Sequence, residues 1–141
     1  MSNAANAYSA YRRTEVETVS QRDLIVMLYQ GAERFLGQSM IAMQNRRIED
    51  AHNGCMRARA IFEELLSTLN MEAGGEIAVR LKGLYAFFLF RIGEANLLKD
   101  ASKLAEIMPI IATLREGWQS VPNENANVTS LSGGAALNML G

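Results

Sequence analysis

The sequence has few of the residues that hold small folds together covalently. Its 141 residues include one cysteine, one histidine, one tryptophan and two prolines. The single cysteine, Cys55, permits no internal disulfide. A domain of this length buries a sizeable core without a disulfide or a structural metal. We therefore expect a single folded unit that depends on hydrophobic packing.

An excess of charge of one sign is also missing. Fourteen Lys and Arg face fifteen Asp and Glu, a formal net charge of -1, so no overall field attracts nucleic acid or an acidic bilayer. The most apolar run, residues 84–90, ends at Arg91, far short of the roughly 20 residues that span a membrane. The N-terminus lacks the basic and apolar segments of a secretory signal. The sequence predicts a cytoplasmic protein with no nucleic-acid partner and no membrane insertion.

Helical periodicity is what the sequence has in abundance. Hydrophobic residues make up 49% of the chain, and they recur at spacings of three and four instead of alternating. The first helix is expected over residues 21–43, where Ser20 and Asp23 form a variant capping box. Its apolar stripe consists of Leu24, Leu28, Phe35 and Met43.

The second and third predicted helices carry heptad seams, in which core residues step alternately by three and four. The seam of the second helix consists of Ile48, Ala51, Cys55, Ala58, Phe62, Leu65 and Leu69. The seam of the third consists of Ala78, Leu81, Tyr85, Phe88, Ile92 and Ala95. The third helix is apolar around most of its circumference, so it is either central or awaits a partner.

A fourth helix is expected over residues 101–119. Pro109 lies inside it, which predicts a kink or a break near Met108. Gly74 and Gly75 suggest a flexible connection before the third helix. With short connections throughout, the sequence predicts an all-α fold, an antiparallel four-helix up-down-up-down bundle over residues 20–119.

The two ends of the chain differ from this core. Residues 1–19 are expected to form a short capping segment that docks through Tyr8 and Tyr11. Residues 120–141 contain one charge and a Ser-Gly-Gly-Ala-Ala run, which predicts a flexible tail. If this tail is held against the bundle, its leucines are the natural anchors.

Candidate residues for catalysis are scarce. Glu49 and His52 form a Glu-x-x-His pair, the unit that di-iron bundles use twice, but a single histidine cannot complete that site within a monomer. Cys55 lies on a core seam without a histidine partner. We expect no enzyme activity, no cofactor and no metal site. A metal site built from Glu49 and His52 across a symmetric dimer stays open as an alternative.

Glycines inside the predicted helices need a reason, because each costs about 1 kcal/mol relative to alanine. Either they allow tight crossings between helices of the chain, or they leave grooves that another helix or peptide can enter. The sequence does not choose between these two uses. The glycines concerned are Gly31, Gly37, Gly54, Gly83, Gly93 and Gly117.

A set of motifs follows in a fixed order along the chain. It comprises Asn6-Ala7-Tyr8 and Tyr11, Leu24 to Ala32, Phe35-Leu36, Gly74 to Ala78, Leu84-Tyr85, Arg91 with Glu94-Ala95-Asn96, and Leu114-Arg115 with Trp118. In order and spacing this set resembles the FliS family of flagellar export chaperones. The resemblance covers residues 6–118.

This resemblance implies a cytoplasmic, flagellin-specific chaperone. Such a protein binds the C-terminal segment of flagellin, prevents premature polymerisation and delivers it to the flagellar type III export gate, an FlhA-type component. An amphipathic cargo of this kind needs apolar grooves between helices. The residues expected to contact flagellin or the cap are Tyr8, Tyr11, Leu28, Tyr29, Leu81, Leu84, Tyr85 and Phe88.

Three alternatives remain open from the sequence. Tyr8 and Tyr11 either cap the groove in the free protein or dock to the export gate. The cargo is either flagellin or, for a helical chaperone of another system, a different secreted protein. A weak homodimer is compatible with the pattern.

Overall fold

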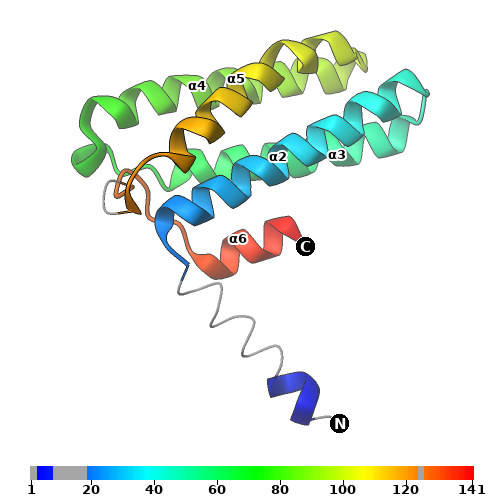
Figure 1. The fold of residues 1–141 in the computed structure, drawn as a ribbon. Coiled ribbons are helices and arrows are strands. Elements are labelled where there is room, and N and C mark those ends of the chain that lie inside the picture. The colour runs from blue at the N-terminus through cyan, green and yellow to red at the C-terminus, as the bar shows by residue number, and fades with distance from the viewer. Residues whose placement is uncertain (1–2, 8–18, 124–125) are drawn as a thin grey trace.

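The computed structural model describes residues 3–7, 19–123 and 126–141 and is almost entirely helical there (Figure 1). Residues 3–7 are helical. The longer helices are α2 (Gln21–Gln44), α3 (Ile48–Ser67), α4 (Met71–Leu98), α5 (Ala101–Gln119) and α6 (Gly133–Leu140). Within the described residues no strand forms, and Leu69 and Thr129 make an isolated antiparallel bridge. The predicted all-α class is confirmed.

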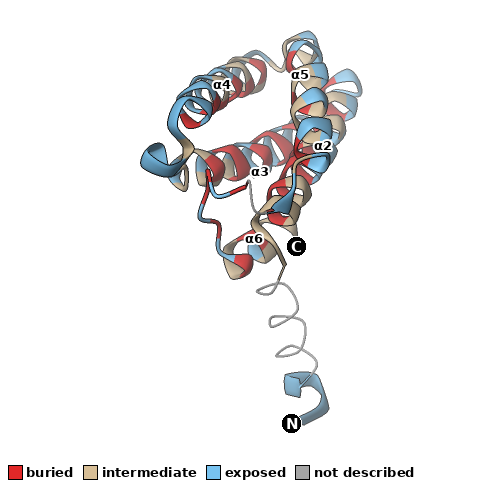
Figure 2. Cartoon of the chain, turned by 60° about the vertical axis from the view of Figure 1, so that its left-hand side comes forward, coloured by how far each residue is buried: buried red, intermediate tan, exposed pale blue. Residues whose placement is uncertain are grey.

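The four long helices lie alongside one another. Helix α2 packs against α3 and α5, and α4 packs against the same two helices. Helix α6 lies against α2 and α3 (Figure 1). The buried side of each long helix faces the others, while the outward sides are exposed (Figure 2). In the part of the chain that is described, no helix has the length and apolar character needed to cross a membrane.

Aromatic rings fill the centre of this arrangement. Tyr29, Phe62, Tyr85 and Phe88 are fully buried and come from α2, α3 and α4. The Phe62 ring centroid lies 6.4 Å from that of Tyr29, 6.0 Å from that of Tyr85 and 5.1 Å from that of Phe88. Edge-on and tilted packing at these separations is favourable for aromatic rings. Phe62 therefore joins three helices at one point.

The ends of the helices follow the local sequence. Ser20 caps α2, its hydroxyl oxygen accepting a hydrogen bond from the Asp23 amide at 3.1 Å, as the capping box predicts. Helix α5 runs through Pro109 without the predicted break. Pro109 and Ala105 are both exposed, so water can bind the carbonyl that the proline leaves without its usual partner. The chain therefore tolerates this proline inside a helix.

The predicted flexible connection at Gly74-Gly75 is also different in the structure. Helix α4 already starts at Met71, capped by the Asn70 side chain, and contains a non-helical residue at Gly75, with φ 53° and ψ -131°. Such a conformation is accessible to glycine and costly for other residues. The first turn of α4 is thereby set apart from the regular helix that follows.

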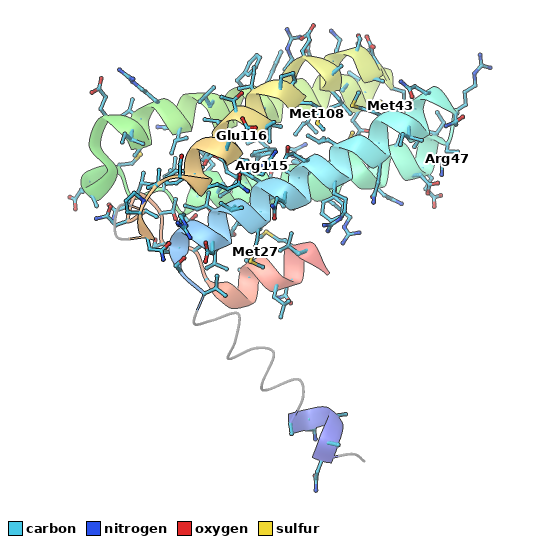
Figure 3. The ribbon with its side chains drawn as sticks, in the orientation of Figure 1. Met27, Met43, Arg47, Met108, Arg115 and Glu116 are labelled. Carbon is cyan, nitrogen blue, oxygen red and sulfur yellow. The ribbon has the colours of Figure 1, made fainter. Side chains whose placement is uncertain are left out.

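The C-terminal segment lies against the helices, in contrast to the flexible tail expected over residues 120–141. Val128 and Leu131 are buried, and Leu137 and Leu140 of α6 pack against the core. Met27 of α2 lies on the side that faces α6 (Figure 3). The leucines named as candidate anchors thus do make contacts.

Backbone hydrogen bonds explain why composition alone is a poor guide to this segment. The Asn70 amide donates to the Val128 carbonyl at 2.7 Å, and the Ser130 amide donates to the Thr68 carbonyl at 3.0 Å. These bonds need no particular side chain. A stretch of small and polar residues can therefore be held without showing a hydrophobic pattern.

Candidate functional site

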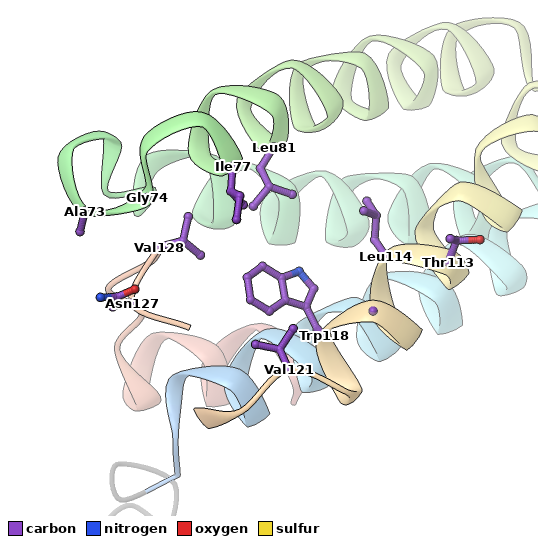
Figure 4. A pocket seen from close by; sticks show the side chains of 11 residues that line it. Ala73, Gly74, Ile77, Leu81, Thr113, Leu114, Trp118, Val121, Asn127 and Val128 are labelled. Atoms are coloured by element: carbon purple, nitrogen blue, oxygen red, sulfur yellow. The ribbon is translucent and has the colours of Figure 1, made fainter. Parts of the chain in front are cut away.

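An apolar groove runs between the N-terminal half of α4 and the C-terminal half of α5 (Figure 4). It has a volume of about 460 Å³. Its lining residues are Ala73, Gly74, Ile77, Leu81, Thr113, Leu114, Gly117, Trp118, Val121, Asn127 and Val128. Thr113 and Asn127 contribute the polar side chains of this lining. The groove follows about two turns of each helix, which suits a short amphipathic segment.

Two glycines shape this groove. A Cβ atom at Gly74 would lie 2.5 Å from Val128 Cγ2, so glycine is needed for the close approach of the C-terminal segment to α4. A Cβ atom at Gly117 would meet no atom within 4 Å among the described residues. Gly117 therefore widens the groove on the α5 side without serving an internal crossing.

The C-terminal segment forms one wall of the groove, and Gln21 fastens it. The Gln21 amide nitrogen donates to the Leu131 carbonyl at 2.8 Å. Its amide oxygen accepts from the Leu131 amide at 2.7 Å and from the Thr129 hydroxyl at 3.0 Å. One side chain at the start of α2 thus satisfies three polar groups of a distant segment.

Behind the groove lies a buried pair of tyrosines. The hydroxyls of Tyr29 and Tyr85 are 2.6 Å apart and share a hydrogen bond, and Trp118 of the groove lies beside Tyr29. Burial raises the pKa of Tyr29 to about 12, although its neighbours Tyr85 and Trp118 act in the opposite direction. Burial, and then the neighbouring Tyr29, raise the pKa of Tyr85. Both hydroxyls are therefore neutral in the folded protein at ordinary pH.

Stability is expected to fall as the pH rises from 10 towards 12. Below pH 10 the tyrosines are protonated in both states, so their contribution is complete. Above it the unfolded chain releases protons that Tyr29, with its pKa of about 12, still holds when folded, which favours unfolding. Urea denaturation at several pH values measures this loss. A Tyr29→Phe/Tyr85→Phe variant should lose less stability over the same range, and an identical loss would contradict the assignment.

The residues predicted from the sequence to contact cargo divide into three groups. Leu28, Tyr29, Tyr85 and Phe88 lie in the core with no exposed surface. Leu81 lines the groove, and Leu84 is half-buried beside the core without lining the groove. Tyr8 and Tyr11 lie outside the described residues.

Sequence reasoning missed most of the groove. Trp118 and Leu114 belong to the motifs on which the family resemblance rests, so a signal for them existed. Gly117 was noted as a helical glycine whose role was open. Asn127 and Val128 gave no signal, because their segment has no periodicity and is held through its backbone.

The remaining candidates for chemistry lie elsewhere. His52 Nδ1 is 2.9 Å from the Asn96 side-chain nitrogen, and both Glu49 and His52 are exposed. Cys55 is buried, and burial raises the pKa of its thiol. Over the described ranges no three His, Cys, Asp or Glu side chains come together as a metal site would require. None of these residues borders the groove.

Comparisons with known proteins agree on one family. A family model described as "Flagellar protein FliS" matches residues 4–125. The "Flagellar secretion chaperone FliS" of Campylobacter jejuni is 37% identical over 117 residues, which cover 83% of this chain and 91% of the relative. The protein of the same name from Vibrio cholerae is 33% identical and covers 86% of this chain and 92% of its own length.

A third relative matches over a longer part of the chain. The "Flagellar secretion chaperone FliS" of Bacillus subtilis is 28% identical over 131 residues, covering 93% of this chain and 97% of the relative. These matches support a role in flagellar export as a chaperone with an export cargo. The chain belongs to the FliS family of flagellar secretion chaperones.

Proposed function

We propose that the protein is a cytoplasmic chaperone for flagellin. In this proposal it binds the C-terminal segment of flagellin, prevents premature polymerisation and delivers the subunit to an FlhA-type export gate. Family membership supports a chaperone role without catalysis. We further propose that α2 to α5 act as an up-down-up-down bundle whose rigidity keeps the cargo site open.

The observation that carries this proposal is the apolar groove between α4 and α5. Ile77 on its rim is 62% exposed, so an apolar partner that covers it would remove apolar surface from water. Trp118, by contrast, is almost fully buried beneath the groove, beside the core residue Tyr29. A rigid aromatic floor with an exposed aliphatic rim suits the apolar face of an amphipathic peptide.

The core residues of the sequence prediction then take a supporting role. Tyr29 and Tyr85 hydrogen bond to each other behind Trp118, so they support the groove without lining it. Leu81 is the predicted residue that we retain as a direct cargo contact. Tyr8 and Tyr11 keep their predicted role as a cap or a gate-docking segment.

Calorimetric titration of the full chain with a peptide of the flagellin C-terminal segment tests the proposal. We expect saturable binding to the unchanged chain and at least about tenfold weaker binding to Gly117→Leu, a loss of about 1.4 kcal/mol. The added side chain enters the groove, and the backbone has room for its Cβ atom.

Gly37→Leu is the matched control. A Cβ atom at Gly37 also meets nothing within 4 Å, and Gly37 does not line the groove. The same substitution on α2 should therefore leave peptide affinity unchanged. Absence of binding to the unchanged chain would refute the flagellin proposal, whereas equal affinity for Gly117→Leu would move the site away from this groove.

A further inference from the structure

The outward face of α4 carries a second apolar seam that the fold does not use. Its members step by four, three, four, three and four, the spacing of a heptad repeat, and none is charged. They are Val79, Gly83, Ala86, Phe90, Gly93 and Leu97. This outer seam lies away from the core seam of the same helix, which contains Tyr85 and Phe88.

The outer seam is open to solvent. Phe90 is 64% exposed, Leu97 83% and Val79 58%. The long helices that pack on α4 are α3 and α5, and Figure 2 shows its other side as exposed. The break at Gly75 lies before Val79, so the whole seam stands on regular helix.

The two glycines of the outer seam leave room for a closely packed partner helix. A Cβ atom at Gly83 or Gly93 would meet no atom within 4 Å among the described residues. Each glycine costs about 1 kcal/mol relative to alanine in an exposed helix, and no internal crossing uses the space. The free space at these two positions permits close approach of another helix.

We propose that the outer seam pairs with the outer seam of a second copy of this chain, with the two α4 helices antiparallel. The positions of the outer seam are spaced symmetrically on either side of position 88. A two-fold axis through this position, with the helices antiparallel, therefore places each seam residue opposite the seam residue at the same distance on the other side of 88. The facing pairs are Val79 with Leu97, Gly83 with Gly93, and Ala86 with Phe90. Each Phe90 ring then lies over the small residues of the partner helix. A parallel pair would instead set Phe90 against Phe90.

Charge along the seam supports the same arrangement. Arg80 and Glu94 flank the outer seam on one side, and an antiparallel two-fold brings the same side of both helices together. Measured along the helix axis, Arg80 then lies within about 3 Å of the partner's Glu94. In the monomer Arg80 pairs with Glu76 at 2.9 Å, and these side chains are 75% and 78% exposed. The dimer thus offers Arg80 a second acidic partner.

The size of the seam predicts a weak dimer. Val79 and Leu97 lie about 27 Å apart along the helix axis, and one helix pair buries less than the about 800 Å² per partner of a standard interface. We expect a dissociation constant above about 1 μM. Leu81 of the cargo groove lies on the opposite side of α4 and stays accessible, so this inference goes beyond the proposed function.

Sedimentation velocity of the cargo-free chain from low micromolar to several hundred micromolar tests the dimer. We expect a reversible monomer–dimer equilibrium, weakened at least about tenfold by Phe90→Ser. Ile41→Ser is the matched control, because Ile41 is 54% exposed on α2 and should leave the equilibrium unchanged. A monomer at every concentration, or equal weakening by both variants, would overturn the proposal.

Cross-linking tests the direction of the pair. Val79→Cys and Leu97→Cys are prepared separately with Cys55→Ala, so that each chain carries one reactive thiol. A short bis-maleimide should join the two proteins when they are mixed and join neither with itself. Cross-linking of Val79→Cys alone would overturn the antiparallel arrangement. If the chain is monomeric and the thiol of Val79→Cys is protected from the maleimide only when flagellin peptide is added, the outer seam binds cargo and the dimer is refuted.

Discussion

Replacing Phe62 with alanine is expected to lower the free energy of unfolding by about 3–5 kcal/mol. The ring has no exposed surface and packs against Tyr29, Tyr85 and Phe88. Its loss removes the transfer free energy of a whole aromatic side chain and leaves a cavity between three helices. Helices cannot close such a cavity without shifting their other contacts.

Urea denaturation followed by circular dichroism measures this effect, with Phe90→Ala as the control. Phe90 lies on the same helix as Phe88 but is 64% exposed. At a concentration well below the dissociation constant of the proposed dimer, its truncation should change the free energy of unfolding by no more than about 0.5 kcal/mol. Similar losses for the two variants would show that Phe62 is not the centre of the core.

The Phe62 substitution is also expected to change the shape of the groove. Tyr29 and Tyr85 contact the Phe62 ring and share the hydrogen bond that lies behind Trp118. Space left by the ring would allow both tyrosines to move. We infer that the core and the cargo groove are stabilised by the same side chains, so their stabilities change together.

The heptad seams explain how much of the fold could be predicted. Every residue of the core seam of α4 is buried, from Ala78 to Ala95, because a strict three-four spacing keeps one face turned towards the neighbouring helices. On α3 the first residue, Ile48, is 56% exposed. Periodicity identifies the buried face but does not say how far the neighbouring helices extend along it.

The same reasoning explains why the site was predicted only in part. Tyr29, Tyr85 and Phe88 were expected to contact flagellin or the cap following the family resemblance, yet as large apolar residues they lie in the core. A groove forms where apolar residues exceed what the core can cover, as at Ile77. Which residues are left over depends on the packing of α4 on α5, and a single sequence does not contain that information.

The structure also divides the helical glycines into two classes that the sequence could not separate. A Cβ atom at Gly54 of α3 would lie 2.8 Å from the Phe35 carbonyl oxygen and would overlap the Ser39 hydroxyl of α2. At Gly37 it would meet nothing within 4 Å. Gly54 therefore permits a helix crossing, whereas Gly37 only weakens its helix.

Opposite effects on stability are expected from the same substitution at these two positions. Gly54→Ala should lower the free energy of unfolding by about 3 kcal/mol, at the upper end of overpacking costs, because a backbone oxygen of α2 cannot move aside alone.

The Ser39 hydroxyl adds to this cost. It donates to the Ala51 carbonyl at 2.9 Å and would have to give up that buried hydrogen bond to make room for the new methyl group. Gly37→Ala should instead raise the free energy of unfolding by about 0.5–1 kcal/mol through helix propensity. Urea denaturation of both variants measures the two changes in the free energy of unfolding. A change of the same sign at Gly37 and Gly54 would mean that the α2–α3 crossing is looser than the close approach of these two backbones indicates.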